Sequence, residues 1–279
     1  MKIALCTRNG DNPAIRLLND YLGSHGHEVT VVTDPRALLD PSSGRGKAFD
    51  VGFWRPDSRD EEVAAFARQG ADILEGQGVR FLNSLASSDR ATNKFVSYAL
   101  FRSRDLLSPP TWVPPQEWDS GTDIPPGPKI VKPVGGKQGR GVKFAESLDA
   151  ALDDLRHRDR LCILQQPIRW TKQLRVVATP DRWIRVYEQA SATVESEKSV
   201  ARFDAEAARV VEDPEDAVVL MGREMVRAVG GDLMRADLLM DNAARLFALE
   251  VNASFGFPHD DERVLKSFLT EMQRVAERS

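Results

Sequence analysis

The strongest constraint on the fold is the alternation of short apolar runs with amphipathic segments in the first third of the chain. One apolar run covers 2–7 and a second β-rich run covers 27–33, and between them Ile15, Leu18 and Leu22 recur at helical spacing. Strands joined through a helix pair in parallel, because a parallel connection needs a crossover of about a dozen residues or more. The cycle continues with a strand at 49–54, a helix at 59–76 and a strand at 79–83. We therefore expect an α/β fold with a Rossmann-like amino-terminal lobe.

Composition excludes several classes of function. The 38 Lys and Arg against 42 Asp and Glu give a net charge of −4, so neither a nucleic-acid nor a membrane partner is expected. The two cysteines, Cys6 and Cys162, lie far apart and outside any CxxC or Cys/His cluster, which argues against disulfides and structural zinc and favours the cytoplasm. The first apolar run is too short for a signal peptide, and the apolar stretches are too short to span a membrane. No GxGxxG follows the first run, so dinucleotide binding is not supported.

A cluster of prolines marks a boundary after the first lobe. Seven of the sixteen prolines lie between residues 109 and 128. Beyond this boundary, the pattern predicts a strand at 128–133, a helix at 146–156 and a strand at 161–166. These three elements predict a small second α/β lobe. Before the boundary, a helix is expected over 88–103.

A glycine-rich segment follows the first strand of this second lobe. Residues 132–142 contain four glycines and three basic residues. Glycine lets backbone N–H groups approach a phosphate, and Lys132 at a strand end adds a point charge. The segment lacks the GK[ST] ending of a P-loop, so nucleotide would be held by another architecture. A flexible hairpin tip with surface charges explains the pattern equally well.

The runs 233–240 and 245–252 are predicted to form a β-hairpin. If the loop is 242–245, Asp237 lies opposite Glu250 and Arg235 lies opposite Asn252, with all four side chains on one face. A loop one residue different would put Asp237 and Glu250 on opposite faces.

Two carboxylates and an amide oxygen on one face of the hairpin are hard ligands suited to Mg²⁺. A solvated polar face on an edge hairpin is the alternative. The nearly continuous apolar run at 246–251 favours a buried strand, in which a carboxylate needs a partner.

Taken in order, these motifs resemble the ATP-grasp superfamily of carboxylate-amine ligases. The resemblance runs from residue 1 to about 258 and rests on Lys132-Pro133 with its glycine loop, the strand from Ile163 to Ile168, Arg175, Asp237 and the run Glu250-Val251-Asn252-Ala253-Ser254. Asn83-Ser84 and the helix with Lys94 are similar to the ribosomal-protein-S6 glutamate ligase-like and LysW-ligase-like groups. Arg235-x-Asp237 is similar to the D-alanine–D-alanine ligases.

The resemblance implies a three-lobed ATP-grasp fold. Its lobes would be a Rossmann-like lobe at 1–108, a central lid at 109–166 and a carboxy-terminal lobe at 167–279 that carries the metal-binding hairpin. ATP would lie between the last two lobes.

The resemblance also implies roles for individual residues. Lys94 and Lys132 would hold the nucleotide phosphates, under a loop containing Gly135, Gly136, Gln138, Gly139 and Gly141. The adenine pocket would be lined by Gln165, Gln166 and Ile168. Two Mg²⁺ ions, or Mn²⁺ in their place, would be held by Asp237, Glu250 and Asn252, with Glu250 bridging them. The catalytic arginines would be Arg175 and Arg235, which would face the transferred phosphoryl group and the tetrahedral centre.

The implied activity is ATP- and Mg²⁺-dependent formation of a C–N bond through an acyl phosphate, as in the ligases of EC class 6.3. The carboxylate and amine substrates would be amino acids or small peptides, and ADP and phosphate would be released. Two alternatives stay open: an enzyme that modifies a ribosomal precursor peptide, and a nucleotide-binding regulator without turnover. A homodimer or homotetramer is compatible with this interpretation.

The sequence departs from the family pattern at two informative places. The usual Asp-Lys pair is Asn93-Lys94, and the acid that often contacts the ribose is missing, because 166–180 contains no Asp or Glu. The ribose partner is therefore not identified from the sequence.

Overall fold

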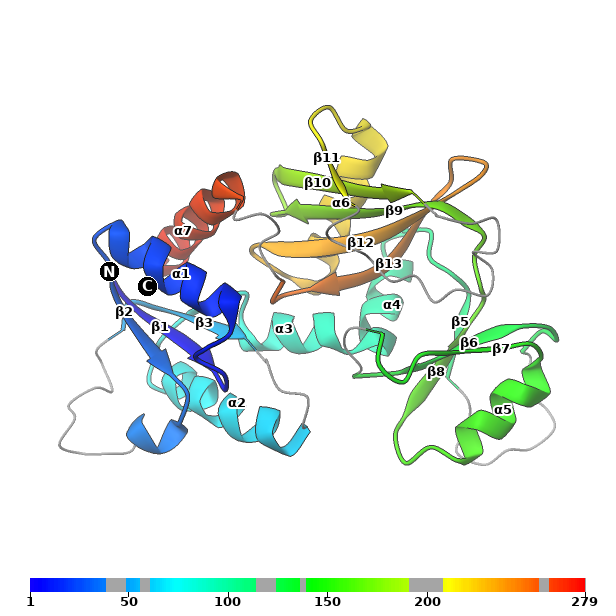
Figure 1. The fold of residues 1–279 in the computed structure, drawn as a ribbon, viewed down its shortest axis with the longest axis horizontal. Coiled ribbons are helices and arrows are strands. Elements are labelled where there is room, and N and C mark those ends of the chain that lie inside the picture. Colours follow the sequence, from blue (N-terminus) through cyan, green and yellow to red (C-terminus); the bar gives the residue numbers. More distant parts are fainter. Residues whose placement is uncertain are drawn as a thin grey trace. The chain divides into compact units, whose positions relative to one another are not determined.

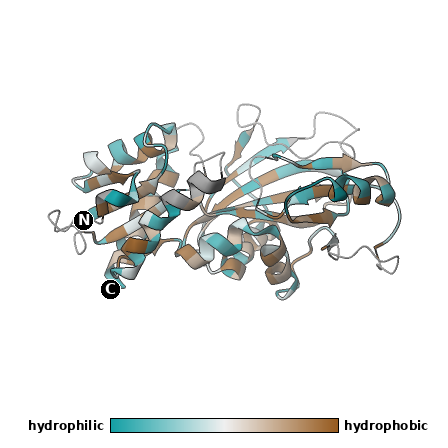
Figure 2. Ribbon diagram, turned by 90° about the horizontal axis from the view of Figure 1, so that it is seen from below, coloured by the Kyte–Doolittle hydropathy of each residue, from teal (hydrophilic) through white to brown (hydrophobic). Residues whose placement is uncertain are grey.

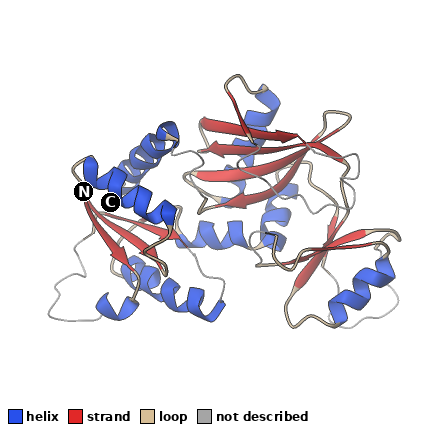
Figure 3. Cartoon of the chain, viewed as in Figure 1, coloured by secondary structure: helices blue, strands red, loops and turns tan. Residues whose placement is uncertain are grey.

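The computed structural model describes residues 1–38, 49–55, 61–113, 124–135, 139–190, 208–255 and 261–278. The chain divides into two compact units. The first unit contains Met1–Ser88, Gly230–Met234 and Ala253–Ser279, and the second contains Asp89–Val229 and Arg235–Asn252. Each unit combines helices with β-sheet, as expected for an α/β chain (Figure 3).

The first unit is built on a parallel sheet in the order β2-β1-β3-β4. Its strands are β1 (Lys2–Thr7), β2 (Glu28–Val32), β3 (Val51–Arg55) and β4 (Phe81–Leu82). The helices along this part of the chain are α1 (Pro13–Ser24), η1 (Pro35–Leu38), α2 (Glu61–Gly76) and α3 (Leu85–Thr92), and α7 (Glu262–Glu277) closes the chain. The predicted parallel β-α-β alternation is confirmed.

Local sequence explains why α1 begins and packs where it does. The side chain of Asn12 accepts a hydrogen bond from the Ala14 N–H. Pro13 is the first helical residue, and the fixed φ angle of proline suits this position. Ile15, Leu18 and Leu22 are all fully buried, so the predicted apolar stripe faces the core. Figure 2 shows hydrophobic and hydrophilic residues alternating along the helices.

The second unit contains a small antiparallel sheet in the order β5-β8-β6-β7. Its strands are β5 (Thr111–Trp112), β6 (Lys129–Pro133), β7 (Lys143–Ala145) and β8 (Cys162–Gln165), and α5 (Leu148–Arg156) packs on it. The strands and the helix that the sequence predicts beyond the prolines, at 128–133, 161–166 and 146–156, are confirmed.

A larger sheet in the second unit has the order β11-β10-β9-β12-β13. Its strands are β9 (Trp170–Ala178), β10 (Trp183–Ala190), β11 (Arg209–Val211), β12 (Met234–Asp241) and β13 (Leu246–Asn252). Two helices, α4 (Lys94–Arg102) and α6 (Asp216–Val229), pack against it, and α6 contacts β9, β10 and β13 (Figure 1). The other face of this sheet carries the polar side chains described below.

The helical segment expected over 88–103 is present as two helices, α3 and α4, which are separated at Asn93. The Asn93 side chain accepts hydrogen bonds from the N–H groups of Phe95 and Val96, both at 3.1 Å, and so caps a new helix. As a result Lys94 becomes the first residue of α4.

Among the described residues, no helix has the length and hydropathy needed to cross a membrane.

Candidate active site

The hairpin of β12 and β13 places Asp237 opposite Glu250 and Arg235 opposite Asn252, as the sequence predicts. The assumed loop length is nevertheless wrong. Near the turn the pairing is shifted by one residue, so that Leu238 lies opposite Ala248 instead of Leu249. A β-bulge between the two registers leaves Leu249 as the extra residue and restores the predicted pairing at the polar end.

The shorter turn is held by Asp241. The Asp241 N–H donates to the Arg245 carbonyl at 3.1 Å, which leaves only three residues in the loop. The Asp241 carboxylate accepts from the N–H groups of Ala243 at 2.9 Å and Arg245 at 2.8 Å. Ala244 takes the left-handed conformation with φ of 57°, as expected for the last residue of a three-residue hairpin loop.

Asp237 is almost completely buried and lies between two arginines. Arg235 donates to both of its oxygens, Nε to Oδ1 at 2.7 Å and Nη2 to Oδ2 at 3.0 Å, and Arg175 Nε lies 3.6 Å from Oδ1. Burial raises the pKa of Asp237, and the two arginines oppose that shift. Burial also lowers the pKa of Arg175 to about 10, while Asp237 acts in the opposite direction.

Glu250 has a different electrostatic environment from Asp237. Burial pushes the pKa of Glu250 upward, but the charges of Lys94, Lys132 and Arg235 together hold it below its usual value. Asn252 Nδ2 lies between the two carboxylates, 3.4 Å from Glu250 Oε1 and 3.5 Å from Asp237 Oδ2. Glu250 therefore stays ionised at neutral pH.

Two lysines from different elements influence Glu250 electrostatically. The Lys94 N–H donates to the Val134 carbonyl at 3.0 Å, which joins the start of α4 to the residue after β6. Lys132, near the end of β6, donates through Nζ to Gln165 Oε1 at 2.5 Å. Burial lowers the pKa of Lys132 to about 8, and Lys94 adds to the shift while Glu250 opposes it. Burial likewise lowers the pKa of Lys94, against the charge of Glu250.

The glycine loop is described at its two ends. Gly139 and Gly141 have φ of 66° and 68°, and a Cβ on Gly141 would lie 2.9 Å from Pro133 Cγ, so glycine is required there. Arg158 holds this end, with Nη1 donating to the Gly141 carbonyl at 2.5 Å and Nε donating to Asp154 at 2.6 Å.

At the other end of the loop, Gly135 is exposed. Gly136 and Gln138 lie outside the described residues.

The predicted adenine-pocket residues are partly engaged in the lobe itself. Gln165 accepts from Lys132 and donates through Nε2 to Thr111 Oγ1 at 3.0 Å. The Gln166 N–H donates to the Pro110 carbonyl at 2.8 Å. Ile168 packs against an apolar cluster with Trp170 and Phe247. An adenine contact for these residues stays a prediction.

One polar residue of this region was missed by sequence reasoning. Gln173 on β9 is only 3% exposed, and its Oε1 atom has no hydrogen-bond partner among the described residues. It lies two residues before Arg175, so both side chains point to the same face of β9. A search for polar residues at strand period from Arg175 would have found it, whereas the search for an acid did not.

Comparison with known proteins decides the fold. No known family model matches the chain. A probable alpha-L-glutamate ligase of Sodalis glossinidius (strain morsitans) is 24% identical over 273 residues, covering 92% of this chain and 90% of that protein. D-alanine–D-alanine ligase from Bacillus anthracis, complexed with ATP, has a TM-score of 0.68 at 14% identity, over 100% of this chain and 98% of that chain. The ATP-grasp ligase PsnB, complexed with minimal precursor, Mg and ADP, has a TM-score of 0.64 at 18% identity, with 98% of each chain covered. The chain has the ATP-grasp fold.

The ATP-grasp residues expected from the sequence gather in one unit. Apart from Gly136 and Gln138, every residue assigned a role by the resemblance is described, and all of them belong to the second unit. Lys94 and Lys132 both act to lower the pKa of Glu250, and Glu250 acts to raise the pKa of each lysine. Glu250 lies directly opposite Asp237. Two ammonium groups and two carboxylates are thus present on neighbouring elements of the second unit.

Proposed function

We propose that the chain is an ATP- and Mg²⁺-dependent ligase that joins a carboxylate to an amine through an acyl phosphate. The observation that carries the proposal is the electrostatic cluster of Lys94, Lys132 and Glu250 beside the Arg235–Asp237 pair. Transfer of a phosphoryl group needs positioning and neutralisation of charge more than it needs a protein nucleophile. The cluster would supply positive charges for the phosphates and a carboxylate for a metal, on neighbouring elements of the ATP-grasp fold.

The residues of the hairpin fit a magnesium site. Among the described residues there is no group of three or more His, Cys, Asp and Glu side chains arranged for a metal, and the site that we propose consists of Asp237, Glu250 and the amide of Asn252. Such a set of hard oxygen donors suits Mg²⁺, which keeps water ligands and binds phosphate oxygens. Asp237, Glu250 and Asn252 would hold the two ions that we propose. Bound Mg²⁺ would supply neutralisation of the charge on the phosphates.

The chain's own residues account for the remaining needs of the reaction. Lys94 and Lys132 would bind the phosphates of ATP and hold the terminal one in line with the substrate carboxylate. The carboxylate oxygen forms a bond to phosphorus as the bond to ADP breaks. The amine then attacks the acyl carbon, and the tetrahedral oxyanion collapses with release of phosphate while the amine gives up a proton to solvent. Arg175 and Arg235 would stabilise the oxyanion by a few kcal/mol.

Gln173 extends the proposal to the nucleotide. Its buried Oε1 is an acceptor on the same face of β9 as Arg175. A ribose hydroxyl is a donor that could meet this need, in place of the acid that the family often uses.

The relatives favour two substrate classes. The similarity to a probable alpha-L-glutamate ligase over most of the chain supports an amino-acid substrate, with glutamate as the first candidate. The likeness to PsnB, complexed with its minimal precursor, supports a precursor peptide as the second. We propose the amino-acid or small-peptide ligase first, because the similarity in sequence is to that protein.

The test is release of ADP and phosphate from Mg·ATP over pools of amino acids, small carboxylic acids and amines. Glu250→Ala is expected to lower turnover by about a hundredfold or more, because a metal and its bridging ligand supply several kcal/mol of charge stabilisation. Glu75→Ala, at an exposed position of α2, is the matched control and should behave as wild type. Turnover that needs both an acid and an amine would support the ligase. Binding of ATP without turnover over every pool, including precursor peptides, would favour the silent regulator.

A further inference from the structure

Asn83 binds the residues that flank the β12–β13 hairpin at its open end. The residue follows β4 and is only 1% exposed. Its Nδ2 donates to the Leu233 carbonyl at 2.7 Å and to the Ala253 carbonyl at 3.2 Å, and its Oδ1 accepts from the N–H groups of Asp232 at 2.9 Å and Leu233 at 3.0 Å. All four residues belong to the first unit. One amide group thus joins the residues that precede β12 to the residue that follows β13.

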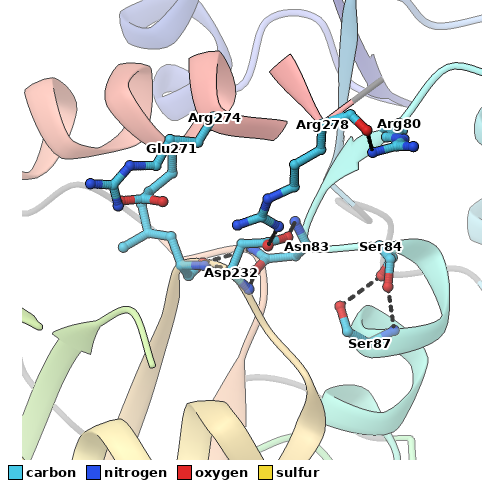
Figure 4. Close-up of polar contacts among 9 residues, drawn as sticks. Arg80, Asn83, Ser84, Ser87, Asp232, Glu271, Arg274 and Arg278 are labelled. Carbon is cyan, nitrogen blue, oxygen red and sulfur yellow. Dashed lines mark hydrogen bonds and ion pairs between the residues drawn. The ribbon is translucent and has the colours of Figure 1, made fainter. Parts of the chain in front are cut away.

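The amide is itself held in place. Asn83 has φ of 59°, a left-handed conformation that asparagine tolerates better than most residues. Its backbone N–H donates to Asp232 Oδ2 at 3.0 Å, and the other oxygen of Asp232 is bound by Arg278 Nη1 at 2.8 Å (Figure 4). The backbone and the side chain of Asn83 therefore both bind Asp232, and its position is fixed from two directions.

The hairpin needs such a clamp because it contains two registers. The turn, held by Asp241, sets the pairing of Leu238 with Ala248. If that register continued, Asp237 would lie opposite Leu249, and Glu250 would point to the other face of the sheet. The other register, which pairs Asp237 with Glu250, is present only on the open-end side of the bulge.

We infer that Asn83 is a positioning residue that fixes the register of the open end of the hairpin, and so keeps Asp237 and Glu250 on one face. Both ends of the hairpin are then held by side chains in registers that differ by one residue. The extra residue must be accommodated between them, and the bulge at Leu249 is the result. The consequence for Mg²⁺ rests on the function proposed above, whereas the consequence for the hairpin does not.

The experiment is amide hydrogen exchange on the whole chain, with peptides that resolve the open half of the hairpin at 234–237 and 250–252 from the turn half at 238–247. Asn83→Gly keeps the left-handed backbone and removes the amide. Asn83→Asp keeps the shape and the acceptor but loses the two hydrogen bonds to the Leu233 and Ala253 carbonyls, and it serves if the glycine variant fails to fold. Ser87→Ala is the matched control, because it removes a hydrogen bond of another buried side chain, from Ser87 Oγ to the Ser84 carbonyl at 2.8 Å, that does not involve the hairpin (Figure 4).

In both Asn83 variants we expect exchange in the open half to accelerate about tenfold or more, and in the turn half by less than about twofold. The Mg²⁺ concentration that half-saturates binding of ATP should rise about tenfold, and Ser87→Ala should change neither quantity.

Equal acceleration in both halves would show a general loss of stability and overturn the inference, as would unchanged exchange in the open half. Selective acceleration with unchanged Mg²⁺ dependence would refute the positioning role. If the wild-type chain does not bind Mg·ATP at all, the proposed function fails, while the exchange pattern still decides whether Asn83 sets the register.

Discussion

Lys132 should make the binding of Mg·ATP depend on pH in a range where an ordinary lysine does not titrate. Burial lowers the pKa of Lys132 from 10.5 to about 8, with Lys94 adding to the shift and Glu250 opposing it. A phosphate is bound by the ammonium form and not by the neutral amine. The apparent affinity therefore follows the protonated fraction of Lys132 in the free protein.

The size of the effect follows from this pKa. With a pKa of about 8, the protonated fraction falls from about nine tenths at about pH 7 to about one tenth at about pH 9. The apparent Kd of Mg·ATP is then expected to rise about tenfold over this range, or about 1.4 kcal/mol. The sign is fixed by the direction of the shift: the free protein loses the proton as pH rises through about 8, binding must restore it, and affinity falls. A lysine with an ordinary pKa would leave the same range flat.

Isothermal titration calorimetry with a non-hydrolysable ATP analogue and Mg²⁺ measures this dependence directly. Lys132→Arg is the control, because its guanidinium stays charged throughout the range and its affinity should not change with pH. Titrations in two buffers of different ionisation enthalpy should show uptake of about half a proton near about pH 8 in the wild type and none in the variant. A flat profile in the wild type, or the same slope in Lys132→Arg, would refute the reasoning.

Two further predictions concern packing and the loop. Gly222→Ala is expected to lower the free energy of unfolding by roughly 1–2 kcal/mol in urea, because its Cβ would lie 2.6 Å from Val176 Cγ1 and overpacking outweighs the gain in helix propensity. In Gly23→Ala of α1 the added Cβ would meet nothing within 4 Å, so this variant should instead raise the free energy of unfolding by about 0.5–1 kcal/mol. A change of the same sign in both variants would contradict the argument. Arg158→Ala should raise the Kd of Mg·ATP about tenfold, because Arg158 holds the Gly141 carbonyl at 2.5 Å, and a change below about twofold would show that this bond does not position the loop.

The first unit was predictable because its elements follow local periodicity. Strands β1 to β4 and helices α1 and α2 alternate along the chain, and parallel pairing follows from the crossovers. The division of the chain into three lobes at the predicted boundaries stays a prediction. The break at Asn93 was not foreseen, although asparagine is a strong capping residue, because the apolar spacing on both sides of it reads as one helix.

Strands β9 and β10 were not predicted, because they carry charge on both faces. Glu188 on β10 lies on the face away from Arg175 and is nearly buried. A buried carboxylate is unfavourable without a cationic partner, and β10 alone provides none for it. It is neutralised by Lys172 of β9 at 3.1 Å and Arg209 of β11 at 2.7 Å. Burial pushes the pKa of Glu188 upward, but its bonds to these two cations hold it below the usual value. The compensation exists only after three strands have paired, so no local pattern reveals it.

The hairpin shows how far sequence reasoning reaches at the candidate site. The residue types alone suggested Asp237, Glu250 and Asn252 as metal ligands, because hard oxygen donors at strand period suit Mg²⁺, and this assignment stays a prediction. Their register was not determined by the hairpin sequence, since the turn held by Asp241 favours pairing that would separate Asp237 from Glu250. The pairing at the open end is accompanied by the amide of Asn83, which lies 150 residues before Leu233. The prediction reached the observed pairing through a wrong loop length that the bulge at Leu249 cancels. If Asn83 acts as we infer, the proposed metal site is specified in two parts: the hairpin supplies the ligands, and a residue far away in the chain keeps them on a common face.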